Sequence, residues 1–162
     1  DVYAPSAGWT VRTAREIAAS VAHAAQHLHQ RGLMHGDLYA HNVLWRRTDA
    51  RHTHTVLTDL GAASFKGADA AQAATLERLD VLAFGHLLDE LLTRCTDVDA
   101  VQDAGPADLH DEAVDAMRLH AAQRHRQVGA TLRELALACT RADVAARPDF
   151  AAVTAALTAL LR

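Results

Sequence analysis

Three polar residues, Asp37, Asn42 and Asp59, have the types and the spacing needed for chemistry on a phosphate group. Asp37 and Asn42 lie in one loop-like segment, and Asp59 follows a predicted hairpin that would return the chain to the same place. Mg²⁺ prefers hard oxygen ligands and usually shares them with phosphates. Taken singly, residues of these types more often serve in turns or as helix caps. Together, at a strand end, two carboxylates and an amide can hold Mg²⁺ and orient a hydroxyl.

A long amphipathic helix is predicted over about residues 10–31, before this polar segment. Its apolar stripe recurs at spacings of four, three and four residues, through Ile17, Val21, Ala24 and Leu28. Gly32 is the predicted stop. The N-terminal cap is either Thr13, in a capping box with Glu16, or Thr10.

A small β-hairpin is predicted to position Asp59. Residues 43–45 and 53–58 form its strands, and residues 59–61 form the turn that ends it. The small and polar residues 62–74 predict a mobile loop. A buried central helix over about residues 75–95, a linker over 96–108 and helices over about 110–124, 131–141 and 150–161 complete the prediction, with Asp149 as the cap of the last helix.

The composition indicates one domain and excludes several functions. The chain has 162 residues, half of them hydrophobic, and a net charge of −4. This charge argues against a nucleic-acid partner and against a polybasic membrane anchor. No apolar tract is long enough to span a bilayer. Cys95 and Cys139 form no CxxC pair, which favours a reducing, cytoplasmic compartment.

Four segments resemble protein-kinase motifs, in the order in which kinases carry them. Residues 35–42 (HGDLYAHN) are similar to the catalytic loop H-R-D-L-x-x-x-N, and residues 57–61 (LTDLG) to the strand and D-F-G turn. Residues 80–85 (DVLAFG) resemble the kinase D-V-W-S-F-G, and residues 139–153 resemble the pattern around R-P-x-F. The amino-acid sequence of the loop most resembles that of bacterial kinases. The resemblance as a whole covers about residues 10–161.

The resemblance implies a fold: mainly α with a small β-hairpin, the C-terminal lobe (C-lobe) of a protein kinase over residues 1–162. The catalytic loop would be 35–42, the metal turn 59–61, the central helix about 75–95 and the C-terminal helices about 110–161.

The resemblance also implies site residues and cofactors. Asp37 would be catalytic and accept or orient the proton of the attacking hydroxyl, while Asn42 and Asp59 would bind the Mg²⁺ that bridges the ATP phosphates. Leu44 would lie under the adenine of ATP. Asp80 would hold the backbone of the catalytic loop by hydrogen bonds.

The only lysine, Lys66, follows the metal turn. Kinases need a lysine on a strand of the N-terminal lobe (N-lobe) to hold the ATP phosphates, and no glycine-rich loop precedes the first predicted helix. We therefore expect the N-lobe of the same chain to be absent. The fragment alone should bind ATP weakly and transfer phosphate negligibly, and micromolar affinity for Mg-ATP in isothermal titration would contradict this.

Other departures from the protein-kinase pattern leave undetermined which class of hydroxyl accepts the phosphoryl group. Gly36 replaces the usual arginine, Tyr39 stands where Ser/Thr kinases usually carry lysine, and no A-P-E segment is present. Arg147 would pair with the glutamate of that segment, and Glu77 is a possible substitute.

Three functions therefore compete. The first is the C-lobe of an ATP-dependent protein kinase that phosphorylates a hydroxyl of Ser or Thr on a protein or peptide. The second is a small-molecule phosphotransferase of the aminoglycoside type, which Gly36 and the short activation segment favour. The third is a pseudokinase binding module, and the intact Asp37, Asn42 and Asp59 weigh against it. The histidine pairs 27/29 and 52/54 are predicted to lie on the surface and not to bind zinc.

Overall fold

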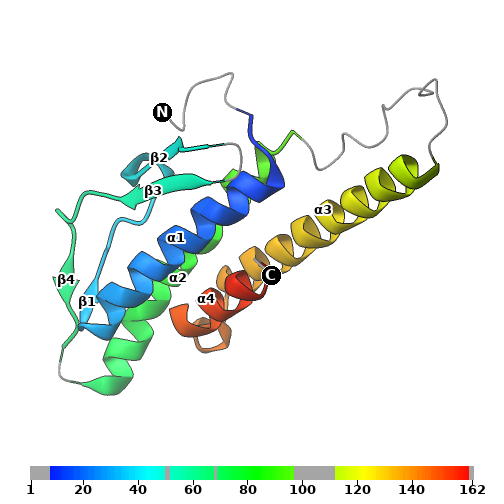
Figure 1. The fold of residues 1–162 in the computed structure, drawn as a ribbon. Helices are drawn as coiled ribbons and strands as arrows, with labels where there is room; N and C mark the ends of the chain where they lie inside the picture. The colour runs from blue at the N-terminus through cyan, green and yellow to red at the C-terminus, as the bar shows by residue number, and fades with distance from the viewer. Residues whose placement is uncertain (1–7, 50–51, 68, 97–111, 161–162) are drawn as a thin grey trace.

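The computed structural model describes residues 8–49, 52–67, 69–96 and 112–160, with side chains of 112–118 excluded. The chain is mainly helical, with two small antiparallel sheets (Figure 1). Its elements are α1 (Val11–Gln30), β1 (Leu33–Met34), η1 (Ala40–Asn42), β2 (Val43–Arg47), β3 (Thr53–Leu57), β4 (Ser64–Phe65), α2 (Ala70–Thr93), α3 (Glu112–Cys139), η2 (Val144–Ala146) and α4 (Phe150–Ala159). The prediction of a mainly α fold with a small hairpin is confirmed. The protein-kinase C-lobe stays a prediction.

Helix α1 is the central element, because α2, α4 and the β2–β3 hairpin all pack against it (Figure 1). The Thr10 side chain accepts a hydrogen bond from the backbone N–H of Thr13, so Thr10 is the cap and the alternative cap at Thr13 is wrong. Glu16 pairs with Arg12 at 3.1 Å and not with the helix start. Gly32 ends the helix with a φ of +74°, as predicted.

The predicted hairpin is present, with Val43 opposite Leu57 and Leu44 opposite Val56. Side chains alternate across it as expected for a strand pair with one covered face. Val43 is buried and Leu57 half-buried, whereas Leu44 and Val56 face outward. The hairpin therefore places the chain just before Asp59 against the core.

The segment predicted as a loop over residues 62–74 contains regular structure. Strand β4 pairs with β1, and α2 begins at Ala70, five residues before its predicted start at residue 75. The Asp69 side chain caps α2 by accepting hydrogen bonds from the backbone N–H groups of Ala71 and Gln72. The prediction failed because β4 is defined by its distant partner strand and not by its own pattern.

The two helices predicted over 110–124 and 131–141 are one continuous helix, α3, within the described residues. The last helix, α4, carries the predicted cap: the Asp149 side chain accepts a hydrogen bond from the Ala152 N–H at 2.8 Å. Apart from Thr96, the predicted linker over 96–108 lies outside the described residues. Within the part of the chain that is described, every helix falls short of the length and apolar character needed to cross a membrane.

Helices α2 and α3 approach closely at Gly85. A Cβ atom built there would lie 2.7 Å from Thr140 Cγ2 and 2.8 Å from Cys139 Cβ. The Cys139 side chain is fully buried, and this burial raises the pKa of its thiol to about 12. Cys139 therefore acts as a small core residue.

Gly85→Ala is expected to lower the free energy of unfolding by about 1–3 kcal/mol, because overpacking outweighs the gain in helix propensity. Urea denaturation followed by circular dichroism measures this change. His86→Ala, at an exposed neighbouring position on α2, is the control. A Gly85→Ala protein as stable as the wild type would show that the two helices are not held this closely.

Candidate active site

The predicted catalytic loop, residues 35–42, holds Asp37 and Asn42 together. The amide Nδ2 of Asn42 donates to the backbone carbonyl of Asp37 at 2.7 Å and to the Asp37 carboxylate at 2.9 Å. Asn42 is buried at the base of β2, while the Asp37 side chain is 38% exposed. Asp37 is thus fixed by its neighbour and still open to an incoming hydroxyl.

Residue Thr58 connects this loop to Asp59. Its backbone N–H donates to the carbonyl of Asn42 at 2.8 Å. From the other side, the buried His35 lies with Nε2 3.0 Å from the Thr58 carbonyl. Because His35 Nδ1 accepts from the backbone N–H of Asp37, Nε2 carries the proton and donates it. The residue before Asp59 is therefore held by the loop that carries the other two polar residues.

Asp59 itself is exposed and adopts a left-handed backbone, with a φ of +60°. Non-glycine residues adopt this conformation rarely and at an energetic cost. One oxygen of its carboxylate accepts the backbone N–H of Gly61 at 3.0 Å, which closes the turn. The Asp59 turn thus directly follows a residue, Thr58, that is hydrogen-bonded to the predicted catalytic loop.

The buried Asp80 of α2 holds the start of the catalytic loop. Its two carboxylate oxygens accept the backbone N–H groups of His35 at 2.8 Å and Gly36 at 2.9 Å. Burial alone would raise the pKa of this carboxyl, but the hydrogen bonds from His29, Gly36 and His35 outweigh it and lower the pKa below its ordinary value. The predicted role of Asp80 agrees with these contacts.

Gly36, where protein kinases usually carry arginine, is required by the local geometry. Its φ is +78°, and a Cβ atom there would lie 2.4 Å from the carbonyl oxygen of Ala62. The backbone of the catalytic loop and the backbone after the Asp59 turn therefore touch at this point. No side chain can be added at position 36 without moving one of them.

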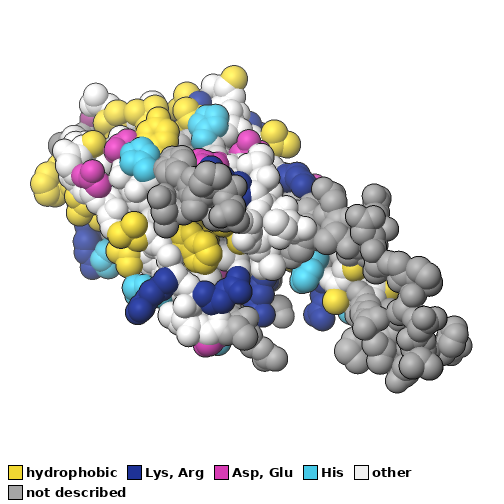
Figure 2. Space-filling model, turned by 90° about the horizontal axis from the view of Figure 1, so that it is seen from above, with side chains coloured by type: hydrophobic (Ala, Val, Ile, Leu, Met, Phe, Trp, Pro, Cys, Tyr) yellow, Lys and Arg dark blue, Asp and Glu magenta, His cyan; other side chains and the backbone are white. Residues whose placement is uncertain are grey.

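An apolar surface lies beside these polar groups. Leu44 and Val56, opposite each other in the hairpin, are 58% and 43% exposed. Tyr39 and Leu60 are also more than half exposed. On the face seen from above, hydrophobic side chains occur close to acidic and histidine side chains (Figure 2). The position of Leu44 is compatible with the predicted contact to a base, which stays a prediction.

The predicted pairing of Glu77 with Arg147 is wrong. Arg147 is buried and donates to the backbone carbonyls of Arg141 and Arg78. Glu77 instead forms an ion pair with Lys66. These partners are distant in sequence, so spacing alone could not identify them.

The position of His29 differs from the prediction. It was predicted to lie on the surface, but it is buried, with Nε2 2.9 Å from the Asp80 carboxylate. A signal was present, because buried alanines precede it at helical spacing (Ala14, Ala18, Ala22 and Ala25). His29 continues that stripe and therefore faces the core.

The donor set fits Mg²⁺ chemically. Both N–H groups of the Asn42 amide point at Asp37, so its Oδ1 remains for a cation. The exposed carboxylate of Asp59 adds a second hard oxygen donor. Among the described residues there is no group of three or more His, Cys, Asp or Glu placed to hold a metal ion. A site here would use one carboxylate and one amide, and phosphate oxygens would complete it.

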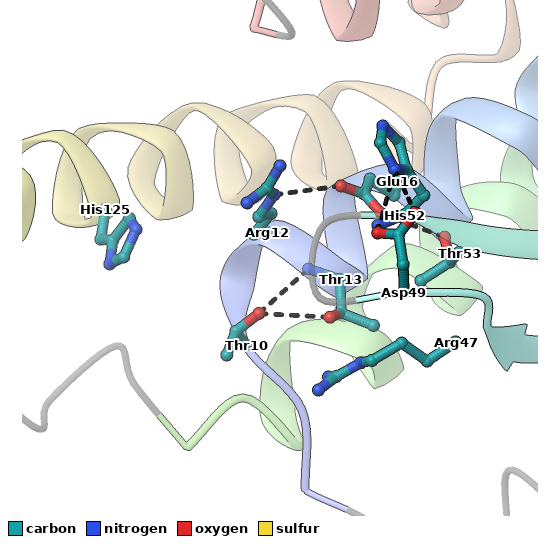
Figure 3. Close-up of a pocket in the computed structure, with 9 residues that line it drawn as sticks. All are labelled: Thr10, Arg12, Thr13, Glu16, Arg47, Asp49, His52, Thr53 and His125. Atoms are coloured by element: carbon teal, nitrogen blue, oxygen red, sulfur yellow. Dashed lines mark hydrogen bonds and ion pairs between the residues drawn. The ribbon is translucent and has the colours of Figure 1, made fainter.

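A separate hollow of about 250 Å³ lies where the start of α1, the hairpin and α3 meet (Figure 3). Two pairs of its charged groups are in contact, Arg12 with Glu16 and Asp49 with His52. Thr53 donates to Glu16 as well. Asp37, Asn42 and Asp59 do not line this hollow, so it is distinct from the candidate active site.

A comparison of the sequence with known protein families supports the interpretation of this chain as a kinase. Residues 1–102, out of 162, match the lipopolysaccharide kinase (Kdo/WaaP) family, and the matched stretch includes all three polar residues of the candidate site. None of the curated proteins matches the chain. The match confirms the predicted class, a phosphotransferase, and leaves the protein-kinase acceptor a prediction. The chain therefore belongs to the lipopolysaccharide kinase (Kdo/WaaP) family.

Proposed function

We propose that this chain is the part of a kinase that transfers the γ-phosphoryl group of Mg-ATP to a hydroxyl of a lipopolysaccharide sugar. One observation carries the proposal: Asp37, Asn42 and the residue before Asp59 are joined by direct hydrogen bonds. We propose a sugar as the acceptor because the matched family is named for lipopolysaccharide kinases.

Asp37 is the proposed catalytic residue. Its carboxylate accepts the proton of the sugar hydroxyl while that oxygen forms a bond to the γ-phosphorus and the bond from phosphorus to the β–γ bridging oxygen breaks. The Asn42 amide keeps the Asp37 carboxylate in one orientation. When bound, Mg²⁺ supplies charge neutralisation on the phosphate oxygens, and Asn42 Oδ1 with the Asp59 carboxylate are its proposed ligands.

The nucleotide base is proposed to lie on the exposed apolar pair of Leu44 and Val56. Lys66 does not bind the ATP phosphates in this arrangement, because its ammonium group pairs with Glu77 and donates a hydrogen bond to the carbonyl of His29. We assign the phosphate-holding cation to an N-lobe of the same polypeptide.

A hydroxyl of Ser or Thr on a protein is the second candidate acceptor. The contact between Asp80 and the catalytic loop, which the resemblance to protein kinases implied, favours it. The two candidates use the same site residues and differ only in the acceptor.

The test uses the full product of the gene with radiolabelled ATP, Mg²⁺ and one of two acceptors: dephosphorylated, deacylated lipopolysaccharide oligosaccharide, or a Ser/Thr peptide library. Labelled sugar is the expected result. Label on peptide alone would replace the proposal with the second candidate. Mg-ATP binding without transfer to either acceptor or to the protein itself would contradict a kinase.

Asp59→Asn is expected to lower turnover about 100-fold, as removal of one electrostatic stabiliser of a transition state does. It should also raise the Mg²⁺ concentration needed for half-maximal rate. Initial rates across a Mg²⁺ titration measure both effects, and Asp89→Asn, at an exposed position on α2, is the matched control. An unchanged Mg²⁺ dependence would remove Asp59 from the metal site.

A further inference from the structure

The segment from Asp59 to Lys66 carries the proposed metal ligand but buries little apolar surface. Leu60 is 53% exposed and Phe65 is 82% exposed. Gly61, Ala62 and Ser64 are exposed as well. Hydrophobic burial therefore cannot be what holds this segment in place.

Polar contacts near Lys66 attach the segment to the helices. Strand β4 pairs with β1 over only two residues, and so short a two-stranded sheet is marginal by itself. The backbone N–H of Lys66 donates to the carbonyl of Gly32 at 2.7 Å. Its ammonium donates to the carbonyl of His29 at 2.8 Å and forms an ion pair with Glu77 of α2. The Lys66 side chain is only 11% exposed, so this attachment is shielded from solvent.

The same attachment reaches the catalytic loop. Glu77 Oε2 lies 3.9 Å from Nδ1 of the buried His29, and Nε2 of that histidine lies 2.9 Å from Asp80. Asp80 in turn holds the backbone at His35 and Gly36. The Glu77–His29 distance is too long for a hydrogen bond, but Lys66 and Asp80 both contact His29 directly, Lys66 at its carbonyl and Asp80 at its ring. The end of the Asp59 segment and the start of the Asp37 loop are therefore attached to the same residue of α1.

The two segments also touch directly. The carbonyl of Ala62 lies where a side chain at Gly36 would begin. A displacement of the Asp59 segment would therefore open this contact and change the distance between Asp59 and Asp37. In phosphoryl transfer, which depends on positioning, such a displacement lowers the rate.

We propose that Lys66 is a positioning residue for phosphoryl transfer: its ion pair with Glu77 and its hydrogen bond to the His29 carbonyl fix the Asp59 segment relative to the catalytic loop. Lys66 does not contact ATP in this role. The inference rests on the function proposed above and adds to it a role for the only lysine in the chain.

The test compares Lys66→Met with Lys66→Arg and with Arg133→Met in the full gene product. Arg133→Met removes a cation from an exposed position on α3 and serves as the control. Lys66→Met is expected to lower kcat about 10- to 100-fold, because misplacement of a catalytic group by about 1 Å costs up to that factor. The KM for ATP should stay unchanged while the Mg²⁺ requirement rises, and Lys66→Arg should restore most of the rate.

Two results would overturn the proposal. A Lys66→Met enzyme with wild-type kcat and Mg²⁺ requirement would show that the contact does not position the site. A raised KM for ATP with unchanged kcat would show that Lys66 binds the nucleotide. The function proposed above fails separately, if Asp37→Asn and Asp59→Asn retain turnover.

A second variant covers the case in which Lys66→Met does not fold. Glu77→Gln removes the ion pair but leaves the bond from Lys66 to the His29 carbonyl. It is expected to lower kcat in the same direction by a smaller factor, without a change in the KM for ATP. Wild-type kcat in Glu77→Gln would then overturn the proposal.

Discussion

Asp80→Asn is expected to lower the free energy of unfolding by about 3 kcal/mol at neutral pH, since a hydrogen bond to a charged group contributes about 1.5–3 kcal/mol. The wild-type carboxylate serves three donors, the backbone N–H groups of His35 and Gly36 and the ring of His29. An asparagine offers one acceptor oxygen, and its amide nitrogen would face an N–H group. At least one of the three donors then loses its acceptor.

The same variant should change the pH dependence of stability. The pKa of Asp80 lies below its ordinary value of 3.8 in the folded state. A group with a depressed folded pKa stabilises the protein above its unfolded pKa, and this contribution is lost as the pH falls through the folded pKa. The stability difference between wild type and Asp80→Asn should therefore be constant above about pH 5 and shrink below about pH 4.

Urea denaturation of both proteins at several pH values between neutral and acid measures this difference. Asp89→Asn on the same helix is the control, because Asp89 is exposed. It should change stability by less than about 0.5 kcal/mol. A difference that stays constant into strong acid would show that the Asp80 carboxylate is not the group that holds the loop.

Local sequence patterns were sufficient to predict much of the fold. The stripe at Ile17 and Val21, the stop at Gly32 and the alternation in the hairpin each depend on residues close together in the chain. Positions within the candidate site followed from a motif whose residues lie in one loop and one adjoining turn. Asn42 and Asp37 are close in space because they are only five residues apart in one loop, and this spacing is visible in the sequence.

Features that depend on distant packing were not predicted. Helix α3 continues through Gly129, because a glycine costs only about 1 kcal/mol in a helix and buried residues on both sides, such as Ala122 and Leu132, favour its continuation. The ion pair of Lys66 with Glu77 depends on strand β4, whose two residues carry no pattern of their own. Local sequence patterns cannot predict such contacts between residues that are distant in the chain.

Asp37→Asn should abolish most phosphoryl transfer while the fold and the nucleotide affinity are retained. The substitution keeps the size of the side chain, and its amide oxygen can still accept the hydrogen bond from Asn42 that Asp37 accepts at 2.9 Å. What it removes is the group that takes the proton of the acceptor hydroxyl. Loss of a general base lowers turnover by about 10² to 10⁴.

The measurement that isolates this effect is a comparison of kcat and of the KM for ATP in the full gene product, with Asp89→Asn as the control. A fall in kcat without a rise in the KM for ATP assigns Asp37 to the chemical step. If Asp37→Asn kept more than about a tenth of the wild-type rate, another group would have to accept the proton. His41 would then be the first to examine, since its Nε2 lies 3.9 Å from the Asp37 carboxylate and its ring is half exposed.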